Sequence, residues 1–579
     1  MVFYSLNLGG APLLDPDEPV YGQTAREMVL TGSWLTPKLN GLLWFDKPPM
    51  YFWLAALSYK IFGISEFAAR FPSAVMAALT LAVTYRWGFV AFGHIAGLAA
   101  AITLGTSFLF AFLARAAVTD MTLCFFMTLS FFMLYMAARE PAEKFKHINL
   151  FYFFSGFAVL TKGPVGIVLP LMVVAPFLVF RKNYALLRAL YSYTGFAFFA
   201  LSALPWYAAM LIIHKSQFFN TFIGYHNLIR FLEPEHAGTN KYWFFFPVIL
   251  AGIFPHVYAL GGILADVLKK LFSRAFYDTY LFGKGEGAEG EKFSLAYLSF
   301  IVCVIFGFFT ISKTKLVTYI FPLFPALAII LGFYYARIFS GRFSNYAGAS
   351  LCALIAGGLS YAFYKKVSGA GLMLSNPEAC YDIGAVCAAI AVIAILFGVI
   401  RRHEYAFISL SAAMCVFLLS VNFYLIPQLG DKYSARGICS EISKVIKPGD
   451  RLAYFSKAPS VLFYSDRVVE HVGLLAPIRR KDSAENASAG ISGENKTAAG
   501  NFARESLGKL ETADMQARRK AKEEALEKFS GFRNARTYLA YNRKSYLIML
   551  ASDFEKGSDE IKVRYNTGSR SGKYIYLYN

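Results

Sequence analysis

The chain has 579 residues, of which 56% are hydrophobic and only 16% are charged, and its mean hydropathy is +0.45. This composition excludes an ordinary soluble globular protein, and its runs of about 20 apolar residues predict transmembrane helices. The net charge of +20 is not accompanied by a nucleic-acid recognition motif, so we expect no nucleic-acid partner. Basic cytoplasmic loops beside anionic membrane lipids explain the charge better.

Apolar runs fill residues 50–426 and predict a polytopic α-helical membrane protein of about 12–13 transmembrane helices. Residues 48–63 are expected to form a helix near the membrane interface. The run 149–180 holds Lys162 near its middle, and a charge at the bilayer centre costs about 2.5–3.5 kcal/mol. We therefore expect two short helices that break at residues 161–164. The expected spans are 68–90, 95–113, 120–138, 149–160, 163–180, 189–213, 242–266, 295–311, 317–335, 345–365, 382–400 and 405–426.

Basic residues mark the loops at one side of the bundle, and the positive-inside rule assigns that side to the cytoplasm. The polar loops at the other ends of the spans, and everything after residue 427, then lie outside. The basic loop residues are Arg139, Lys144, Lys146, Arg181, Lys182, Arg188, Lys269, Lys270, Arg274, Arg337, Arg342, Arg401 and Arg402.

Residues 431–579 are no longer membrane-like and predict a small soluble α/β domain, whereas residues 1–430 form the transmembrane domain. An insertion at about residues 481–530, first rich in Ala, Ser, Gly and Asn and then in Lys and Glu, is expected to be solvated and low in complexity. The expected elements are a helix from Ser434 to Ile446 and strands at Arg451–Phe455, Val468–Val472, Tyr546–Leu550 and Tyr574–Tyr578.

Carboxylates and lysines gather in the outer loops. Asp15-Pro16-Asp17-Glu18 precedes an amphipathic helix pattern at Tyr21–Val29, and Asp46-Lys47-Pro48-Pro49 follows on the same side. A carboxylate near a lysine suits a phosphate-bearing substrate, because the carboxylate can hold a metal or a proton and the lysine can hold the phosphate. Taken alone, the first of these motifs is also an ordinary polar turn.

Later outer loops add further polar groups, and each also has a structural explanation. Asp120 heads an apolar span and is also a candidate helix N-cap, while Lys162 is also a candidate snorkelling lysine. Isolated histidines are usually not metal ligands. The shared sidedness of these groups predicts an active site at one membrane surface. The remaining outer residues are His226, Arg230, His236 and Ser312-Lys313-Thr314-Lys315.

This ordered set of motifs resembles the aminoarabinose transferases of lipid A and the wider protein-mannosyltransferase-like GT-C glycosyltransferases. The resemblance covers roughly residues 12–340 and continues by architecture only; it is specific for the superfamily and weak for the sugar. The matching segments are Asp17-Glu18-Pro19-Val20-Tyr21, Ala25-Arg26-Glu27-Met28, Gly32-Ser33-Trp34, Pro37-Lys38-Leu39-Asn40-Gly41, Phe45-Asp46-Lys47-Pro48-Pro49, Arg115 with Thr119-Asp120, Thr161-Lys162-Gly163-Pro164, His226 to Phe231, and Ser312 to Leu316 with Tyr319 and Pro322.

The resemblance implies transfer of a sugar from a polyprenyl-phosphate donor to a lipid A-like or other envelope acceptor, a lipid or a glycan. It places the active site and the C-terminus on the periplasmic side of the bacterial inner membrane. Asp17 and Asp120 match the family's required acids. Asp46, which stands where the family usually has Glu, would pair with His226 as a zinc site, with His236 as a rival ligand. The residues that the resemblance assigns to substrate binding are Glu18, Tyr21, Lys47, Lys162, Arg230, Lys313 and Tyr319.

The chemistry of a sugar–phosphate bond agrees with these residues. Its cleavage leaves a phosphate anion, which lysines stabilise, and a cation-like sugar, which a carboxylate stabilises. A phosphate acceptor needs no general base, whereas a hydroxyl acceptor does, and Asp17 is then the candidate.

Three other functions stay open at this point. The first is glycosylation of protein Ser or Thr, or of another envelope glycan, by a related enzyme. The second is a transporter or flippase for a lipid-linked saccharide, which would carry ionisable residues near the midplane on broken helices in repeated halves. The third is a structural assembly factor whose soluble domain binds the partner.

The start of the chain departs from the family pattern. Only about 14 residues precede the first acidic loop, and crossing the membrane core takes about 20. We therefore expect the natural protein to begin upstream of Met1, with a full first membrane helix.

Overall fold

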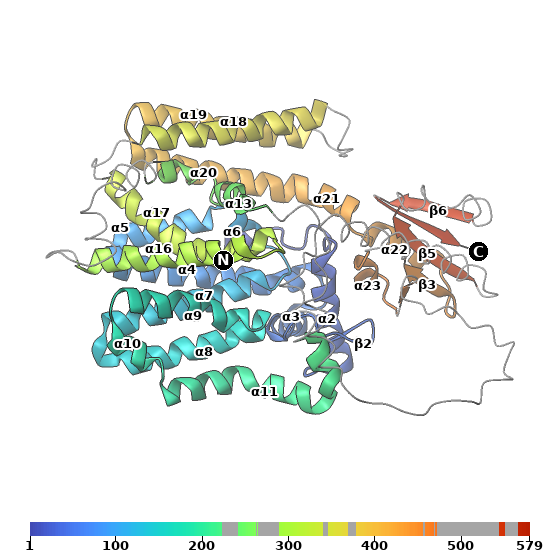
Figure 1. Cartoon of the computed structure of the whole chain (residues 1–579). Coiled ribbons are helices and arrows are strands. Elements are labelled where there is room, and N and C mark those ends of the chain that lie inside the picture. The colour runs from blue at the N-terminus through green and yellow to red at the C-terminus, as the bar shows by residue number, and fades with distance from the viewer. Residues whose placement is uncertain are drawn as a thin grey trace, which may run out of the picture. The chain divides into compact units, whose positions relative to one another are not determined.

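The computed structural model falls into two compact units, residues 1–430 and 431–579 (Figure 1). The predictions at His226, Arg230, His236 and residues 481–530 lie outside the described residues. The structure describes residues 1–222, 241–261, 263, 289–339, 345–368, 378–454, 458–467, 469–471, 544–550, 566–571 and 573–578.

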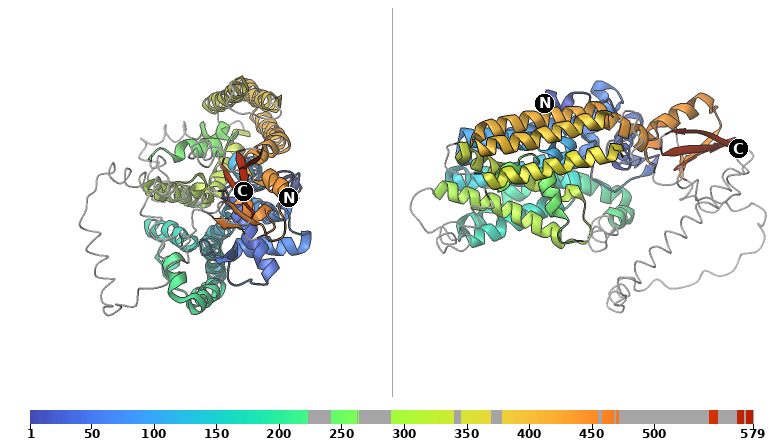
Figure 2. Two further views of the ribbon diagram at one scale, coloured as in Figure 1. Left: turned by 90° about the vertical axis from the view of Figure 1, so that its right-hand side faces the viewer. Right: turned by 90° about the horizontal axis from the view of Figure 1, so that it is seen from above.

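The first unit is a bundle of long helices that run side by side (Figures 1 and 2). Its helices are α1 (Val2–Ser5), α2 (Asp17–Thr31), α3 (Met50–Phe62), α4 (Glu66–Phe92), α5 (His94–Gly105), α6 (Phe108–Leu113), α7 (Asp120–Arg139), η1 (Pro141–Glu143), α8 (Lys144–Lys162), α9 (Val165–Phe180), α10 (Tyr184–Ala189), α11 (Tyr193–Phe218), α13 (Phe245–Gly252), α16 (Glu289–Ile311), η4 (Val317–Leu323), α17 (Phe324–Phe339), α18 (Tyr346–Ser368), α19 (Glu378–Val399), α20 (His403–Ser420) and η5 (Val421–Leu425), followed by α21 (Ile426–Tyr433).

The polytopic architecture agrees with the prediction from hydropathy. Among the described residues, seven helices are long and apolar enough to cross a membrane, fewer than the 12–13 expected. One expected span is missing from this count because the run 95–113 divides into two shorter helices, α5 and α6. The hydroxyls of Thr106 and Ser107 donate to the carbonyls of Ile102 and Thr103, at 2.7 and 2.6 Å, and such back-bonding bends helices.

The predicted break in residues 149–180 is confirmed. Helix α8 ends at Lys162, Gly163 has a φ of +84°, and α9 begins at Val165. A positive φ is readily adopted only by glycine, so Gly163 ends α8 and leaves Lys162 in its last turn.

Successive helices run in opposite directions, so helix ends that are far apart in sequence lie at the same end of the bundle. Helix α7 runs from Asp120 to Arg139, and α8 returns to Lys162. At the other end of the bundle, the Arg181 guanidinium lies 5.9 Å from the ring centroid of Phe293. Asp120 and Lys162 thus share one end, and Arg139 and Arg181 belong to the opposite end.

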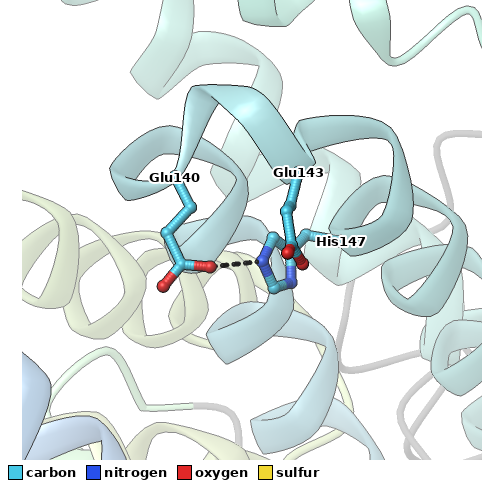
Figure 3. A group of neighbouring side chains, drawn as sticks. All are labelled: Glu140, Glu143 and His147. Atoms are coloured by element: carbon cyan, nitrogen blue, oxygen red, sulfur yellow. Dashed lines mark hydrogen bonds and ion pairs between the residues drawn. The ribbon is translucent and has the colours of Figure 1, made fainter.

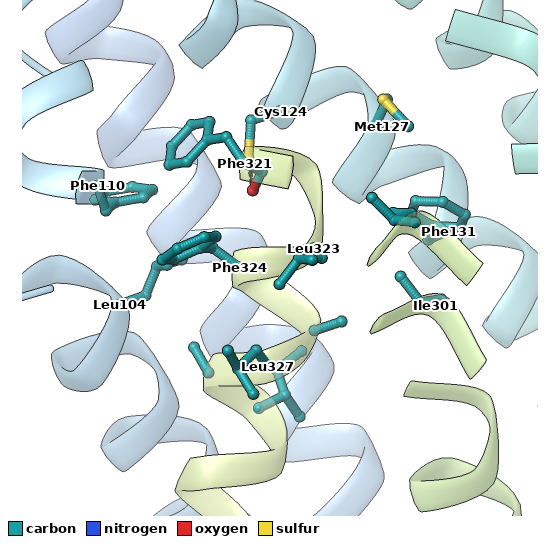
Figure 4. Packing of buried hydrophobic residues seen from close by; sticks show 14 of the residues in the cluster. Leu104, Phe110, Cys124, Met127, Phe131, Ile301, Phe321, Leu323, Phe324 and Leu327 are labelled. Atoms are coloured by element: carbon teal, nitrogen blue, oxygen red, sulfur yellow. Dashed lines mark hydrogen bonds between the residues drawn. The ribbon is translucent and has the colours of Figure 1, made fainter. Parts of the chain in front are cut away.

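Aromatic and aliphatic side chains pack together in the core where α5, α6, α7 and η4 meet (Figure 4). The rings of Phe110 and Phe321 lie 5.9 Å apart, and those of Phe321 and Phe324 lie 5.8 Å apart. Helices α5 and α17 approach closely, since a Cβ on Gly332 would lie 2.4 Å from the carbonyl oxygen of Ala96. This dense packing supplies a rigid base for the residues at the end of the bundle.

The second unit is an α/β domain with a five-stranded mixed sheet of order β4-β3-β5-β7-β6. Strand β3 pairs in parallel with β4 and β5, and β7 pairs antiparallel with β5 and β6. The helix and the strands expected from sequence are present, β4 being shorter than expected, whereas α23 and β6 were not predicted. The bounds are α22 (Arg436–Val445), β3 (Arg451–Tyr454), α23 (Ser460–Tyr464), β4 (Glu470–His471), β5 (Ser545–Leu550), β6 (Asn566–Ser571) and β7 (Tyr574–Tyr578).

Candidate active site

The first acidic loop is tied to the bundle by a buried ion pair. Arg70 of α4 donates from Nε and Nη2 to the two carboxylate oxygens of Glu18, at 2.8 and 2.6 Å. The same guanidinium donates to the carbonyl oxygens of Leu8, Ala11 and Pro12. Because one cation collects the loop carbonyls and Glu18 together, the start of α2 is fixed against α4.

Glu18 is engaged by protein donors on both oxygens. Besides Arg70, the backbone N–H groups of Ala117 and Leu14 donate to it, at 2.8 and 2.9 Å. Burial alone would raise the pKa of Glu18, but Arg70 and these two donors lower it below its usual value. We therefore propose that Glu18, expected from the resemblance to bind substrate, instead positions the loop.

Asp17 is the neighbour of Glu18 at the start of α2, and its side chain is exposed. Asp17 still contacts solvent, but the surrounding residues remove part of its hydration, and this loss, together with the Asp120 carboxylate, raises the pKa of Asp17, which Lys47 and Lys162 partly offset. Charged residues from α7, α8 and the loop before α3 therefore act electrostatically on the Asp17 carboxylate at the start of α2.

Asp120 and Lys162 form the second part of the site. Lys162 Nζ, at the end of α8, lies 2.6 Å from Asp120 Oδ1 at the head of α7. The same ammonium lies 5.6 Å from the ring centroid of Tyr319. Both partners of the pair are largely buried, at 17% and 11% side-chain exposure, so the pair is well shielded from solvent.

Asp46 and Lys47 reach the site from a short hairpin. Asn40 and Gly41 have φ angles of +56° and +77°, which two-residue hairpin turns require. Both their backbone N–H groups donate to Glu27, at 2.6 and 3.0 Å. The hairpin of β1 (Lys38–Leu39) and β2 (Leu42–Leu43) then delivers Lys47, whose Nζ lies 2.9 Å from Asp46 Oδ2.

Two other residues predicted to bind substrate, Tyr21 and Lys313, differ in their exposure to solvent. Tyr21 is buried, with ring centroids 5.9 Å from those of both Tyr51 and Phe52, so its described contacts belong to packing between α2 and α3. Lys313 is exposed. In the same turn Lys315 is buried, and its Nζ donates to the carbonyl of Ser312 at 2.5 Å.

Of the predicted zinc pair, only Asp46 lies within the described residues. The Asp46 carboxylate is paired with Lys47, and the structure groups it with no further metal-binding side chains among the described residues. The group of ligand atoms found there is Glu140, Glu143 and His147 (Figure 3), whose ligand atoms lie within 4.8 Å of one another. It follows the end of α7, about 30 Å from Asp120 along a 20-residue helix, so it does not belong to this site, and the zinc pair stays a prediction.

A cavity of about 780 Å³ adjoins the carboxylates within the first unit, and both Asp17 and Asp120 line it. Most of its other walls are aliphatic or aromatic, with Arg115 and Asn422 among the polar residues. Ligand sites commonly combine an apolar cavity of this size with a few fixed polar groups.

Comparison with known proteins agrees with this geometry. Residues 46–208 match the family described as dolichyl-phosphate-mannose-protein mannosyltransferase. The chain is 29% identical to undecaprenyl phosphate-alpha-4-amino-4-deoxy-L-arabinose arabinosyl transferase 1 of Proteus mirabilis, over 58% of this chain and 57% of that protein. It is 27% identical to the corresponding transferase of Aeromonas salmonicida, over 57% of each chain. The crystal structure of ArnT from Cupriavidus metallidurans bound to undecaprenyl phosphate superposes with a TM-score of 0.72 at 19% identity, covering 100% of this chain and 96% of that one.

The chain has the fold of the Cupriavidus ArnT and is similar in sequence to the aminoarabinose transferases. The aligned part spans less than two thirds of these curated relatives' own lengths. In this fold the candidate-site residues Asp17, Lys47, Asp120 and Lys162 lie together at one end of the bundle.

The roles of Arg70 and Asn422 were not predicted from the sequence. Arg70 lies within the expected apolar span 68–90, and charged residues in such spans are usually functional or paired, so that signal was present. Asn422 lies in η5, a π-helical turn at the end of α20, and no spacing in the sequence marks that turn. Arg115 was noted only through the family resemblance.

Proposed function

We propose that this chain transfers a sugar from a polyprenyl-phosphate donor to a lipid A-like acceptor at the periplasmic face of the inner membrane. The observation that carries the proposal is a cluster of charged side chains at one end of a GT-C bundle. Its members come from separate segments and are Asp17, Lys47, Asp120 and Lys162. The Proteus and Aeromonas relatives are named as arabinosyl transferases that use an undecaprenyl-phosphate sugar, and the Cupriavidus ArnT was crystallised with undecaprenyl phosphate.

In this proposal the two lysines act on the donor. The bond between the sugar C1 and the phosphate oxygen breaks, and its electron pair leaves with the polyprenyl phosphate. Lys47 and Lys162 stabilise the anion that forms, because fixed cations in a shielded site lower the energy of developing negative charge. The acceptor oxygen then forms the new bond to C1.

Asp17 and Asp120 act on the other side of the reaction. Asp120 is paired with Lys162 at 2.6 Å, so it holds the ammonium toward the site. Asp17 is exposed and its carboxylate stabilises the cation-like sugar. A phosphate acceptor attacks as an anion without a base, whereas for a hydroxyl acceptor Asp17 takes the proton.

The periplasmic orientation is part of the proposal. Asp120 and Lys162 belong to the end of the bundle opposite to Arg139 and Arg181, and basic residues favour the cytoplasmic side. Alkaline phosphatase fused after Asn579 should be active, and a green fluorescent protein fusion exported by the general secretory route should be dark. The reverse pattern would place the site in the cytoplasm and remove the proposed acceptor.

Mass spectrometry tests the reaction itself. Lipid A and envelope glycoproteins would be compared between cells with and without the gene, and between wild type and Asp17→Asn. A pentose- or hexose-sized mass on lipid A that requires Asp17 supports the proposal. Unchanged lipid A in all strains, with the protein present in the membrane, would contradict it.

A protein acceptor is the second candidate. The matched family is described as a protein mannosyltransferase, and its match covers Asp46, Lys47, Asp120 and Lys162. A sugar on Ser or Thr of envelope proteins, with lipid A unmodified, would select this alternative and require a general base.

A further inference from the structure

The turn that joins α7 to α8 carries a cluster of potential metal ligands, at the end of the bundle opposite to the candidate active site. Glu140 follows α7, Glu143 is the last residue of η1, and His147 lies at the beginning of α8. The ligand atoms of the three side chains all lie within 4.8 Å of one another. The cluster shares no residue with the candidate active site, so an inference about it does not depend on the proposed function.

The local backbone brings these three residues together. Glu143 directly precedes α8, and residues four positions apart on a helix, such as Glu143 and His147, lie on the same face. The turn η1 begins with Pro141 and places Glu140 beside that face. Within this turn the backbone N–H of Glu143 donates to the carbonyl of Glu140 at 3.0 Å. The three positions are therefore held by hydrogen-bonded backbone.

His147 is the buried member of the cluster, with a side chain that is only 9% exposed. Its Nε2 lies 2.9 Å from Glu140 Oε2. Because an ionised carboxylate only accepts, Nε2 carries the proton of a neutral ring and Nδ1 carries a lone pair. This Nδ1 is buried and has no hydrogen-bond partner among the described residues. Buried polar atoms nearly always have a partner, and a bound cation would provide one.

The contact between Glu140 and His147 is typical of metal sites. An imidazole that binds a metal commonly donates its other ring N–H to a carboxylate, which fixes the tautomer and the orientation of the ring. In Figure 3 the imidazole reaches both carboxylates of the cluster. Bonds of about 2.0–2.2 Å to zinc require two ligand atoms within about 4.4 Å of each other. The Glu143 side chain is 51% exposed, so a small rotation can bring its carboxylate into this range.

The charges around the cluster favour a cation. Two carboxylates face one ammonium, that of Lys146, whose Nζ lies 2.5 Å from Glu143 Oε2. This pair is exposed, and such pairs contribute little to stability, so a divalent ion can replace the ammonium. The other cations of the turn, Arg139 and Lys144, each lie over an aromatic ring, at 6.0 and 5.1 Å from its centroid.

We propose that this turn binds one zinc ion. His147 Nδ1 and a carboxylate oxygen of Glu143 are its protein ligands, water completes the coordination, and Glu140 orients the imidazole. A site that combines imidazole with carboxylate suits zinc, whereas Mg²⁺ and Ca²⁺ prefer oxygen ligands alone. The ion fixes the turn between α7 and α8, the two helices whose other ends carry Asp120 and Lys162.

Isothermal titration calorimetry with Zn²⁺ and with Mg²⁺ tests the site on the full chain in detergent, without a histidine tag. All forms carry Asp46→Asn, which removes one ligand of the predicted zinc pair at the other end of the bundle. This parent should bind one Zn²⁺ per chain. His147→Ala and Glu143→Gln should each weaken zinc binding about 100-fold or more, because each removes one of the two protein ligands.

Two further variants test the roles of the neighbouring side chains. Glu140→Gln should weaken zinc binding about 10–100-fold, as the loss of an outer carboxylate does in other metal sites. Lys146→Met should strengthen it, because the ammonium that competes for Glu143 is removed. His94→Ala is the matched histidine control. His94 is exposed at the start of α5 and lies 3.0 Å from the Tyr85 hydroxyl, so this variant should bind zinc like the parent.

Thermal melting tests the same site and controls for folding. Zinc bound to the folded chain should raise the melting temperature of the parent and leave that of Glu143→Gln unchanged. With a chelator present the two forms should melt alike, because Glu143 is exposed and its pair with Lys146 contributes little. If His147→Ala does not fold, Glu143→Gln decides the question alone.

Three results would overturn the proposal. The first is a folded parent that binds no zinc. The second is zinc binding that survives both Glu143→Gln and His147→Ala, which would identify an adventitious ion only. The third is Mg²⁺ binding as tight as that of Zn²⁺ and independent of His147, which would identify an acidic surface without an imidazole ligand.

Discussion

Arg70 of α4 and Glu18 of α2 form a buried two-point ion pair, with the guanidinium nitrogens 2.8 and 2.6 Å from the carboxylate oxygens. Both side chains are at most 8% exposed. The pair lies one residue from Asp17, so the position of the candidate catalytic carboxylate depends on it.

Glu18→Gln should destabilise the protein strongly. Removing one partner of a buried ion pair leaves an uncompensated charge and typically costs about 3–5 kcal/mol. Thermal unfolding in detergent should therefore begin at a clearly lower temperature than in wild type. Glu143→Gln is the control, because Glu143 and Lys146 form an exposed pair and such pairs contribute little. Equal melting temperatures for both variants would contradict the structural role of Glu18.

The stability contributed by the Glu18–Arg70 pair should depend on pH. The pKa of Glu18 is lowered in the folded chain, so its contribution to stability is complete above the unfolded-state pKa and is lost as the pH falls through the folded-state pKa. Below that range wild type and Glu18→Gln should converge in stability. A gap between them that stays constant down to the lowest pH at which the protein folds would show that Glu18 does not titrate in this way.

Asp17→Asn should abolish transfer and leave the fold intact. Asp17 is exposed and its side chain does not hold the loop, which Arg70 and Glu18 do. We expect a loss of about 100-fold or more in kcat, at an unchanged melting temperature, because each tenfold loss corresponds to about 1.4 kcal/mol of barrier. Residual activity within tenfold of wild type would exclude a catalytic carboxylate at this position.

The sequence predicted the elements that depend on hydropathy and turn chemistry. Lys162 in an apolar run required a break, and Gly163 provides it with a φ of +84°. The sidedness of Asp120 and Lys162 followed from the same argument. The hairpin at Asn40-Gly41 was not predicted, although Asn-Gly is a hairpin signal, and the structure relates this turn to the placement of Lys47.

Other features depend on partners distant in sequence. Arg70 contacts Glu18 across 52 positions, and Arg115 contacts Asn422 across 307, and one sequence gives no information on such pairs. Strand β6, Asn566–Ser571, was missed because its residues are small and polar, whereas strand propensity favours β-branched and aromatic residues. The substrate roles of Glu18 and Tyr21 stay predictions, and the structure adds that Glu18 anchors the loop and that Tyr21 packs against Tyr51 and Phe52.

Lys162 and Asp120 should act as a coupled unit. Lys162→Ala leaves a largely buried carboxylate without its partner at 2.6 Å, so both stability and affinity for the polyprenyl-phosphate donor should fall. Adding Asp120→Asn should recover much of the stability, because the unpaired charge is gone, but not the donor affinity. A double-mutant cycle of melting and donor binding measures both. Additive effects on stability would show that the pair is not energetically coupled.

The pH dependence of transfer should follow the pKa of Asp17, and substitutions of its charged neighbours should shift it. The reaction uses the Asp17 carboxylate, so activity falls as the pH drops through its pKa, which partial loss of hydration and the Asp120 charge raise. Lys47 lowers that pKa and Asp46 raises it, so Lys47→Met should move the acid limb of kcat/KM to higher pH and Asp46→Asn should move it to lower pH. Because Asp17 is exposed, both displacements should shrink at high ionic strength, where surface charges are screened within about 3 Å at 1 M salt. The two substitutions are adjacent in one loop, so a common structural disturbance would move both limbs in the same direction, and that outcome would refute the assignment of the limb to Asp17.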